Sequence, residues 1–232
     1  MVRPIELYDK DNAYVWKITR VNYSICVSGA AAGKTVEADK ELAERLGAAI
    51  ARSGHIITTG ATVGLPYYAA RAAKMEGGMS IGFSPASTVR EHVFKYRLPI
   101  GVFDFVNYTG LNYVGRDAYL VLSSDAVITI GGRMGSLHEF TTALESNTIC
   151  AILTGSDGAA DTVKYLMDTL EGVHRENVIY DDNPEELVAK VIARLDRDYK
   201  DIDTSVLAAC WYLNADCDEY GRPIKKKSDR KG

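Results

Sequence analysis

The chain has 232 residues, of which 47% are hydrophobic and 25% are charged, and its formal net charge is −4 at pH 7. These values are ordinary for a soluble globular protein and exclude a disordered chain, a collagen-like chain and a disulfide miniprotein. The negative charge argues against a broadly basic nucleic-acid surface, and no apolar run reaches the length of a bilayer span. The first residues contain no apolar signal core, so we expect a cytoplasmic protein that binds neither nucleic acid nor membrane.

Short apolar strands alternate with amphipathic helices from residue 24 to residue 197. The clearest strand is 126–130, which is fully apolar apart from one threonine and runs into two glycines. The clearest helix is 36–53, where apolar residues recur at helical spacing. In chain order, the sequence predicts strands at 24–29, 55–60, 79–83, 100–106, 126–130, 148–153 and 177–180, and helices at 36–53, 65–75, 112–123, 136–145, 161–170 and 183–195.

This alternation predicts an α/β fold, a Rossmann-like doubly wound parallel sheet with helices on both faces. We expect an N-terminal extension over 1–23, a nucleotide-binding domain over 24–197 and a C-terminal segment over 198–232. Within that last segment, 206–213 is predicted to dock as a helix and the lysine-rich run at 225–232 to be a flexible, solvated tail.

The four cysteines show no C-x-x-C spacing. Cys26 and Cys150 lie inside apolar runs, which indicates buried, reduced thiols. A zinc or disulfide pair of Cys210 and Cys217 is the alternative. The histidines are scattered without metal-ligand spacing, so we predict no metal site.

Three of the predicted strands end in clusters of small residues, at 28–33, 58–64 and 131–136. Ligands of such sheets bind beyond the carboxyl ends of the strands. The first cluster is similar to a phosphate-binding P-loop, but Ser28 stands where that motif requires its first glycine. The strict dinucleotide fingerprint is also absent. What remains is a turn of small residues at a helix N-terminus, where the backbone can approach an anion.

The third cluster carries the strongest functional signal. Its glycines let the backbone fold closely around a ligand. Ser136 and Glu139 have the spacing of a capping box, so Glu139 either caps its own helix or projects from the first turn toward a ligand. The predicted phosphate- or nucleotide-binding residues of the three clusters are Ser28, Gly29, Gly60, Thr62, Gly131, Gly132, Arg133, Gly135 and Ser136.

In order and spacing, these clusters resemble the Lonely Guy family of cytokinin-activating phosphoribohydrolases, whose signature is P-G-G-x-G-T-x-x-E. The resemblance covers roughly residues 24–195. It implies that Glu139 is the catalytic glutamate and that Arg116, 23 positions earlier, is the catalytic arginine. It also implies a homodimer, and it implies no cofactor.

The chain departs from the family pattern around the ligand. The fold assignment survives these changes, whereas the specificity does not follow from the resemblance. Gly131 replaces the proline, Arg133 the second glycine, Ser136 the threonine, Ala61 a glycine, Asp117 the lysine after the arginine, and His138, expected to be exposed, an acidic residue.

The resemblance implies hydrolysis of the N-glycosidic bond of a nucleoside 5′-monophosphate to free base and ribose 5-phosphate. Glu139 would stabilise the oxocarbenium-like sugar and orient water, while Arg116 would hold the phosphate or ribose. Tyr108 and Tyr113 are candidates for stacking on the base, with a core or interface role as the alternative. The second hypothesis is a non-catalytic binder of a nucleotide-derived ligand, similar to molybdenum-cofactor carriers and nucleotide sensors, which the unusual Arg133 favours.

Overall fold

The computed structural model describes residues 5–8, 14–17, 22–156 and 158–199. Strands β1 (Ile5–Tyr8) and β2 (Tyr14–Lys17) form an antiparallel pair. Residues Asn22–Arg197 form a separate compact unit, which contains the features discussed below. The predicted docking helix at 206–213, the basic tail, Cys210 and Cys217 lie outside the described residues.

The compact unit is built on a seven-stranded sheet in the order β6-β5-β4-β3-β7-β8-β9, in which every pairing is parallel. This confirms the predicted doubly wound α/β fold. From β3 the chain runs outward on one side and then returns to β7, beside β3, to build the other side. The strands are β3 (Ser24–Gly29), β4 (Ile56–Thr59), β5 (Ser80–Ser84), β6 (Phe105–Tyr108), β7 (Ala126–Ile130), β8 (Ile149–Leu153) and β9 (Val178–Asp181).

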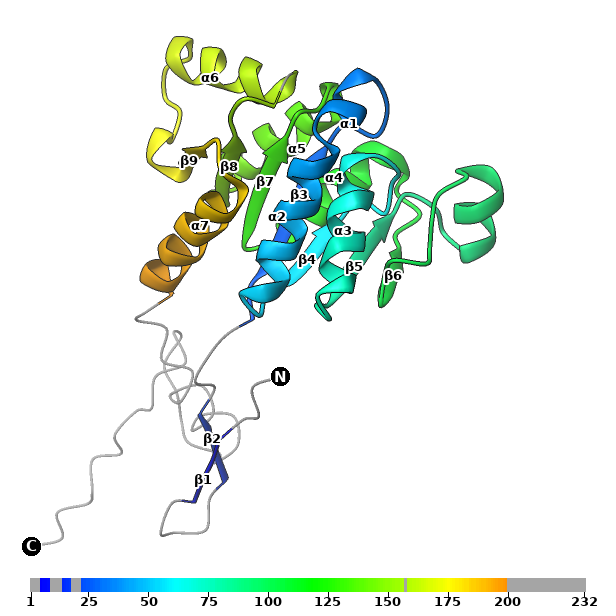
Figure 1. Ribbon diagram of the computed structural model, residues 1–232, viewed down its shortest axis with the longest axis vertical. Helices are drawn as coiled ribbons and strands as arrows, with labels where there is room; N and C mark the ends of the chain where they lie inside the picture. The colour runs from blue at the N-terminus through cyan, green and yellow to red at the C-terminus, as the bar shows by residue number, and fades with distance from the viewer. Residues whose placement is uncertain (1–4, 9–13, 18–21, 157, 200–232) are drawn as a thin grey trace, which may run out of the picture. The chain divides into compact units, whose positions relative to one another are not determined.

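Helices cover both faces of this sheet (Figure 1). One core lies between the sheet and α2, α3 and α7, and the other between the sheet and α4, α5 and α6. All residues of β7 and β8 are buried, which explains why both strands are apolar apart from Thr129 of β7. The helices are α1 (Lys34–Ala38), α2 (Lys40–Arg52), α3 (Leu65–Met75), α4 (Asn112–Leu122), α5 (Met134–Glu145), α6 (Ala159–Thr169) and α7 (Pro184–Asp198), with short turns η1 (Glu91–Lys95) and η2 (Arg175–Asn177).

Several predicted boundaries were wrong, among them the following three. The single helix expected over 36–53 is two helices, which meet at the buried Asp39, a residue type that favours helix starts over helix interiors. The strand expected over 100–106 is β6, which begins only at Phe105. It lies at the edge of the sheet and is only partly buried, so its sequence carries no clear burial pattern. The helix expected from Ser136 begins at Met134.

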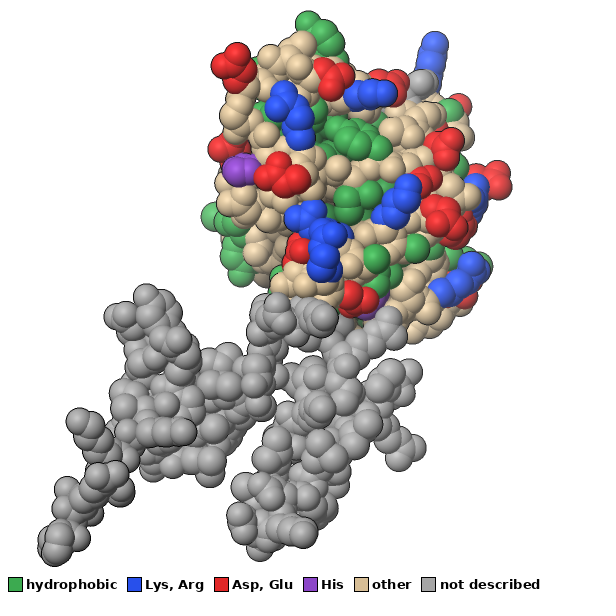
Figure 2. Space-filling view, turned by 90° about the vertical axis from the view of Figure 1, so that its left-hand side faces the viewer, with side chains coloured by type: hydrophobic (Ala, Val, Ile, Leu, Met, Phe, Trp, Pro, Cys, Tyr) green, Lys and Arg blue, Asp and Glu red, His purple; other side chains and the backbone are tan. Residues whose placement is uncertain are grey.

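The surface of the compact unit carries both signs of charge. Figure 2 shows acidic and basic side chains interspersed across one face. Some of them pair between helices, as Arg45 of α2 does with Glu185 of α7 at 2.6 Å. Among the described helices, none is long and apolar enough to cross a membrane.

Candidate functional site

A cavity of about 220 Å³ lies where β3, β4 and β7 end. This is the point at which the strand order reverses, where open α/β sheets bind their ligands. The three small-residue clusters and the start of α4 form its walls. Its lining residues are Val27, Gly29, Ala30, Ala31, Gly60, Thr62, Pro66, Tyr113, Arg116, Asp117, Arg133, Gly135, Ser136 and Glu139.

The first two clusters pack directly on each other. The backbone N–H of Leu65 donates to the carbonyl of Ala30 at 2.9 Å. Gly64 has a φ of +82°, and a Cβ there would lie 2.2 Å from that same carbonyl oxygen. Only glycine combines this backbone conformation with such a close approach. The turn after β4 is therefore shaped to close the cavity beside β3.

The two glycines that open the third cluster support the cavity but do not line it. The N–H of Gly131 donates to Ser156 Oγ at 2.9 Å, and the carbonyl of Gly132 accepts from Ala159 N–H at 3.1 Å. The turn between β8 and α6 thus stabilises this loop through hydrogen bonds on the side away from the cavity. Gly131 and Gly132 were predicted to bind phosphate, but the N–H of Gly131 is already used within the protein.

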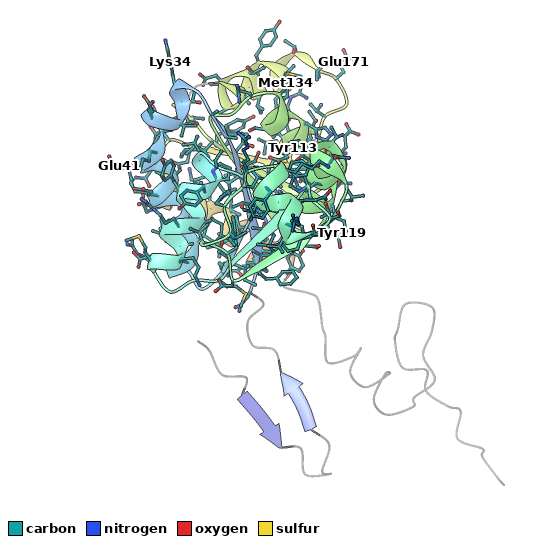
Figure 3. The ribbon with its side chains drawn as sticks, turned by 90° about the vertical axis from the view of Figure 1, so that its right-hand side faces the viewer. Lys34, Glu41, Tyr113, Tyr119, Met134 and Glu171 are labelled. Atoms are coloured by element: carbon teal, nitrogen blue, oxygen red, sulfur yellow. The ribbon has the colours of Figure 1, made fainter. Side chains whose placement is uncertain are left out.

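Helix α5 points its N-terminus at the cavity. Arg133, not Ser136, is its N-cap residue, so the capping box of Ser136 with Glu139 does not form. The N–H groups of Met134, Gly135 and Ser136 begin the helix and therefore have no acceptor within it. The Arg133 side chain is exposed, and no hydrogen bond or ion pair joins it to another described residue. In Figure 3, Met134 stands at the same end of the compact unit as Lys34.

Glu139 projects from α5 to the sheet. It is only 8% exposed and accepts a hydrogen bond from the hydroxyl of Ser28 on β3. Burial raises the pKa of Glu139 to about 7, the nearby Arg116 guanidinium opposes that rise, and the Asp117 carboxyl adds to it. The partner of Glu139 is therefore Ser28 of strand β3 and not a residue of its own helix. Ser28 binds this carboxyl but is absent from the cavity lining.

Arg116 is buried, in contrast to the surface arginine that its helix alone would favour. Its Nη1 donates to the carbonyls of Gly60 and Phe83, the latter at 3.0 Å, and its Nε donates to Asp117 Oδ1 at 2.9 Å. A Cβ at Gly60 would lie 2.0 Å from that Nη1. Three of the five guanidinium N–H groups thus donate to other groups of the protein. The two N–H groups of Nη2 donate to no other described residue.

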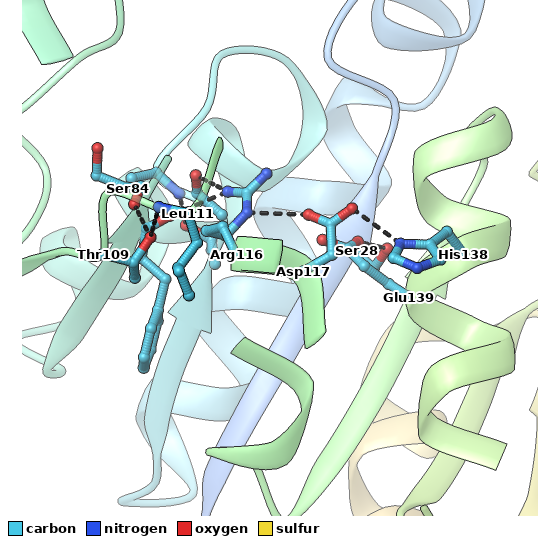
Figure 4. A network of polar contacts seen from close by, with 12 residues as sticks. Ser28, Ser84, Thr109, Leu111, Arg116, Asp117, His138 and Glu139 are labelled. Carbon is cyan, nitrogen blue, oxygen red and sulfur yellow. Dashed lines mark hydrogen bonds and ion pairs between the residues drawn. The ribbon is translucent and has the colours of Figure 1, made fainter. Parts of the chain in front are cut away.

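Asp117 is the site residue that the sequence analysis did not select. It is 5% exposed and lines the cavity, and its Oδ2 lies 3.2 Å from Nδ1 of His138 (Figure 4). His138 was expected to be simply exposed, but its side chain is only 39% exposed and contacts this carboxylate. The signal for Asp117 was present in the sequence, as an acidic residue in place of the family's lysine.

Of the two tyrosines predicted to stack on a base, the structure brings one to the cavity. Tyr113 lines it, with its ring centre 5.8 Å from Cζ of Arg116. Tyr108 lies on β6 and is absent from the lining. Its ring packs edge-on against His92, which is fully buried between Ser84 Oγ at 2.8 Å and the Pro99 carbonyl at 3.0 Å.

Within the described part of the chain, no group of three or more His, Cys, Asp or Glu side chains is placed to hold a metal ion. Cys26 and Cys150 are buried and free. Burial raises the pKa of the Cys150 thiol to about 12 and that of Cys26 well above its usual value. Both are thus expected to stay as unreactive thiols.

The raised pKa of Glu139 predicts a protein that loses stability as pH rises from about 4.5 to about 7. In this window the folded state retains a proton that the unfolded chain releases, so the free energy of unfolding falls with increasing pH. The loss should be about 3 kcal/mol. Urea unfolding at pH 5 and pH 8 measures it. Glu139→Gln should match the parent at pH 5 and exceed its stability at pH 8, and an unchanged pH dependence in this variant would contradict the prediction.

The sequence and the fold of this chain are similar to those of known proteins. The model of the SLOG cluster4 family matches residues 22–188. An uncharacterized protein of Archaeoglobus fulgidus is 30% identical over 122 residues, which are 53% of this chain and 75% of that protein.

Two solved structures match nearly over their full length. The molybdenum cofactor binding protein of Rippkaea orientalis is 26% identical, with a TM-score of 0.62, over 76% of this chain and 99% of its own. The molybdenum cofactor carrier protein of Chlamydomonas reinhardtii is 26% identical, with a TM-score of 0.61, over 75% of this chain and 98% of its own.

Proposed function

Because this chain belongs to the SLOG cluster4 family, as its resemblance to the Lonely Guy proteins led us to expect, we propose that it binds a phosphorylated, nucleotide-like ligand in this cavity and holds it without cleaving it. One observation carries the second half of this proposal: the side chains that would perform cleavage are engaged by the protein itself. Arg116 is bonded to two backbone carbonyls and to Asp117, and Glu139 is bonded to Ser28.

The protonation of Glu139 supports binding of the ligand rather than its hydrolysis. Stabilising an oxocarbenium-like sugar requires an ionised carboxylate. Burial raises the pKa of Glu139, which favours the protonated form of its carboxyl. A protonated carboxyl is a hydrogen-bond donor, which suits retention of an anionic ligand rather than stabilisation of a cation.

The phosphate is expected at the start of α5. The N–H groups of Met134, Gly135 and Ser136 are free of helical partners, and a helix N-terminus favours anions. Arg133 adds a guanidinium without a described partner, in the position where the Lonely Guy pattern has glycine. Tyr113 provides a ring at the cavity wall for a flat heterocycle.

The comparisons suggest the ligand class. The two structural relatives named above bind or carry molybdenum cofactor, in which a phosphorylated pterin holds the molybdenum. A pterin resembles a purine in size and flatness, and a terminal phosphate suits the N-terminus of α5. We therefore propose a phosphorylated pterin or purine as the ligand that this chain carries.

Calorimetry with nucleoside monophosphates, and release of bound pterin on oxidative denaturation of the purified protein, test this proposal. We expect a phosphorylated ligand to bind and the matching nucleoside not to bind. Arg133→Gln should weaken binding about tenfold to a hundredfold, the value of a charge-assisted hydrogen bond. Lys34→Gln, a matched loss of charge outside the cavity lining, should leave affinity unchanged. Equal losses in the two variants would contradict the placement of the phosphate.

Hydrolysis of the N-glycosidic bond is the second candidate function. It is favoured because Arg116 and Glu139, the pair that the Lonely Guy resemblance marks as catalytic, line one cavity. The same ligands, incubated with the protein and analysed by chromatography, separate the two functions. Release of free base from monophosphates, lost in Glu139→Gln with affinity retained, would establish the hydrolase and replace the carrier proposal.

A further inference from the structure

Four polar side chains, His138, Asp117, Glu139 and Ser28, lie between the protein surface and the buried wall of the cavity, and Figure 4 shows two contacts among them, His138 with Asp117 and Glu139 with Ser28. His138 is 39% exposed, and its Nδ1 lies 3.2 Å from Oδ2 of Asp117. The Asp117 carboxyl lines the cavity together with that of Glu139 and helps to raise its pKa, while Glu139 in turn accepts a hydrogen bond from Ser28. The imidazole of His138, which contacts solvent, is thereby linked to the buried carboxyl of Glu139.

Asp117 is the middle of this chain, and both of its oxygens are engaged. Oδ1 accepts from Nε of Arg116, and Oδ2 faces His138. Arg116 is its cationic neighbour and Glu139 is a second carboxyl nearby, so the charge of Asp117 acts on Glu139 directly. The charged and titratable groups around Glu139 are Arg116, Asp117 and Tyr113 from α4, His138 and Arg133 from the start of α5, and Cys26 from β3.

We propose that His138 is a positioning residue that acts through Asp117 to control whether Glu139 holds a proton, and so sets the charge that the cavity presents to its ligand. The inference concerns the same cavity as the proposed function, which it deepens, but it needs no ligand to be bound.

The direction of the coupling follows from electrostatics. When the His138 ring is protonated, it neutralises Asp117, which lowers the cost of a negative charge on Glu139. When the ring is neutral, Asp117 repels that charge, and Glu139 keeps its proton. The two sites thus compete for one proton, and their titrations are coupled. Uptake of a second proton makes the group of four neutral overall, which favours an anionic ligand, and loss of the shared proton leaves two negative charges, which disfavours it.

The carbon-13 shift of the Glu139 carboxyl, followed by NMR against pH in the full chain, tests the coupling. His138→Gln keeps a donor for Asp117 but cannot take up a proton. We expect it to raise the midpoint of the Glu139 titration by roughly half a pH unit or more. His174→Gln is the matched control, because His174 also contacts a carboxylate, Glu176 at 3.0 Å, but both side chains are exposed. It should leave the midpoint unchanged.

An equal midpoint for Glu139 in the parent and in His138→Gln would overturn the inference. The pathway through Asp117 is tested by adding Asp117→Asn, after which His138→Gln should have no further effect. Should that buried substitution prevent folding, the comparison of the His138 and His174 variants decides alone, since both positions are partly exposed. Because no ligand is added, failure here is distinct from failure to bind a phosphorylated ligand.

Discussion

Replacing Arg116 by methionine is expected to lower the free energy of unfolding by about 3–5 kcal/mol, the cost of removing one partner from a buried ion pair. The side chain of Arg116 is 5% exposed and that of Asp117 8% exposed, so water cannot replace the lost cation. The carbonyls of Gly60 and Phe83 would lose their donor as well. Urea unfolding at pH 7 measures the change.

Arg45→Met is the control for this experiment. Arg45 also pairs with a carboxylate, Glu185, but the two side chains are 40% and 42% exposed. Exposed pairs of this kind contribute no more than about 1 kcal/mol, because water and salt screen them. If Arg116→Met were no more costly than Arg45→Met, Arg116 would not connect the end of β4, the end of β5 and α4 in the way described.

Replacing Gly47 by alanine is expected to destabilise the protein by about 3 kcal/mol, although alanine is the better helix former. Gly47 lies in α2, and a Cβ there would come within 2.0 Å of the carbonyl oxygen of Ala69 in α3. That contact is with backbone, so one helix must move away from the other. The first small-residue cluster leads through the short α1 into α2, and the second leads directly into α3, so the movement should weaken ligand binding too.

Gly135→Ala provides the opposite case. Gly135 also lies in a helix, α5, but nothing stands within 4 Å of a Cβ built there. The same substitution should therefore be neutral or stabilise by up to about 1 kcal/mol. Unfolding curves of the two variants should differ in sign, and a stabilising Gly47→Ala would show that α2 and α3 tolerate a wider spacing.

The parallel sheet was predictable because its central strands are buried on both faces and end in small residues. The apolar run 126–130 coincides with β7 for this reason. Boundaries failed where burial is partial, as in β6, or where one residue interrupts a periodic pattern, as Asp39 does between α1 and α2. Neither feature changes hydrophobic spacing enough to be read from sequence.

The candidate site was predictable in its members more than in their contacts. Sequence spacing selected Arg116 and Glu139, and both line the cavity. It offered Ser136 as the partner of Glu139, since local spacing is visible in a sequence. The actual partner, Ser28, comes from a strand 111 positions away. Such a bond depends on strand order, which brings β3 next to β7, and no local pattern records it.

The contact between Asp117 and His138 has a consequence for how the two positions change during evolution of the family. In the Lonely Guy pattern these two positions hold a lysine and an acidic residue, whereas this chain has the acidic residue at the first position and a histidine at the second. Changing the first position alone would set two acidic residues face to face, and changing the second alone would set a lysine opposite a histidine, each beside the buried Arg116 and Glu139. The two positions should therefore vary together among relatives, and a relative with only one of the exchanges should show a rearranged site.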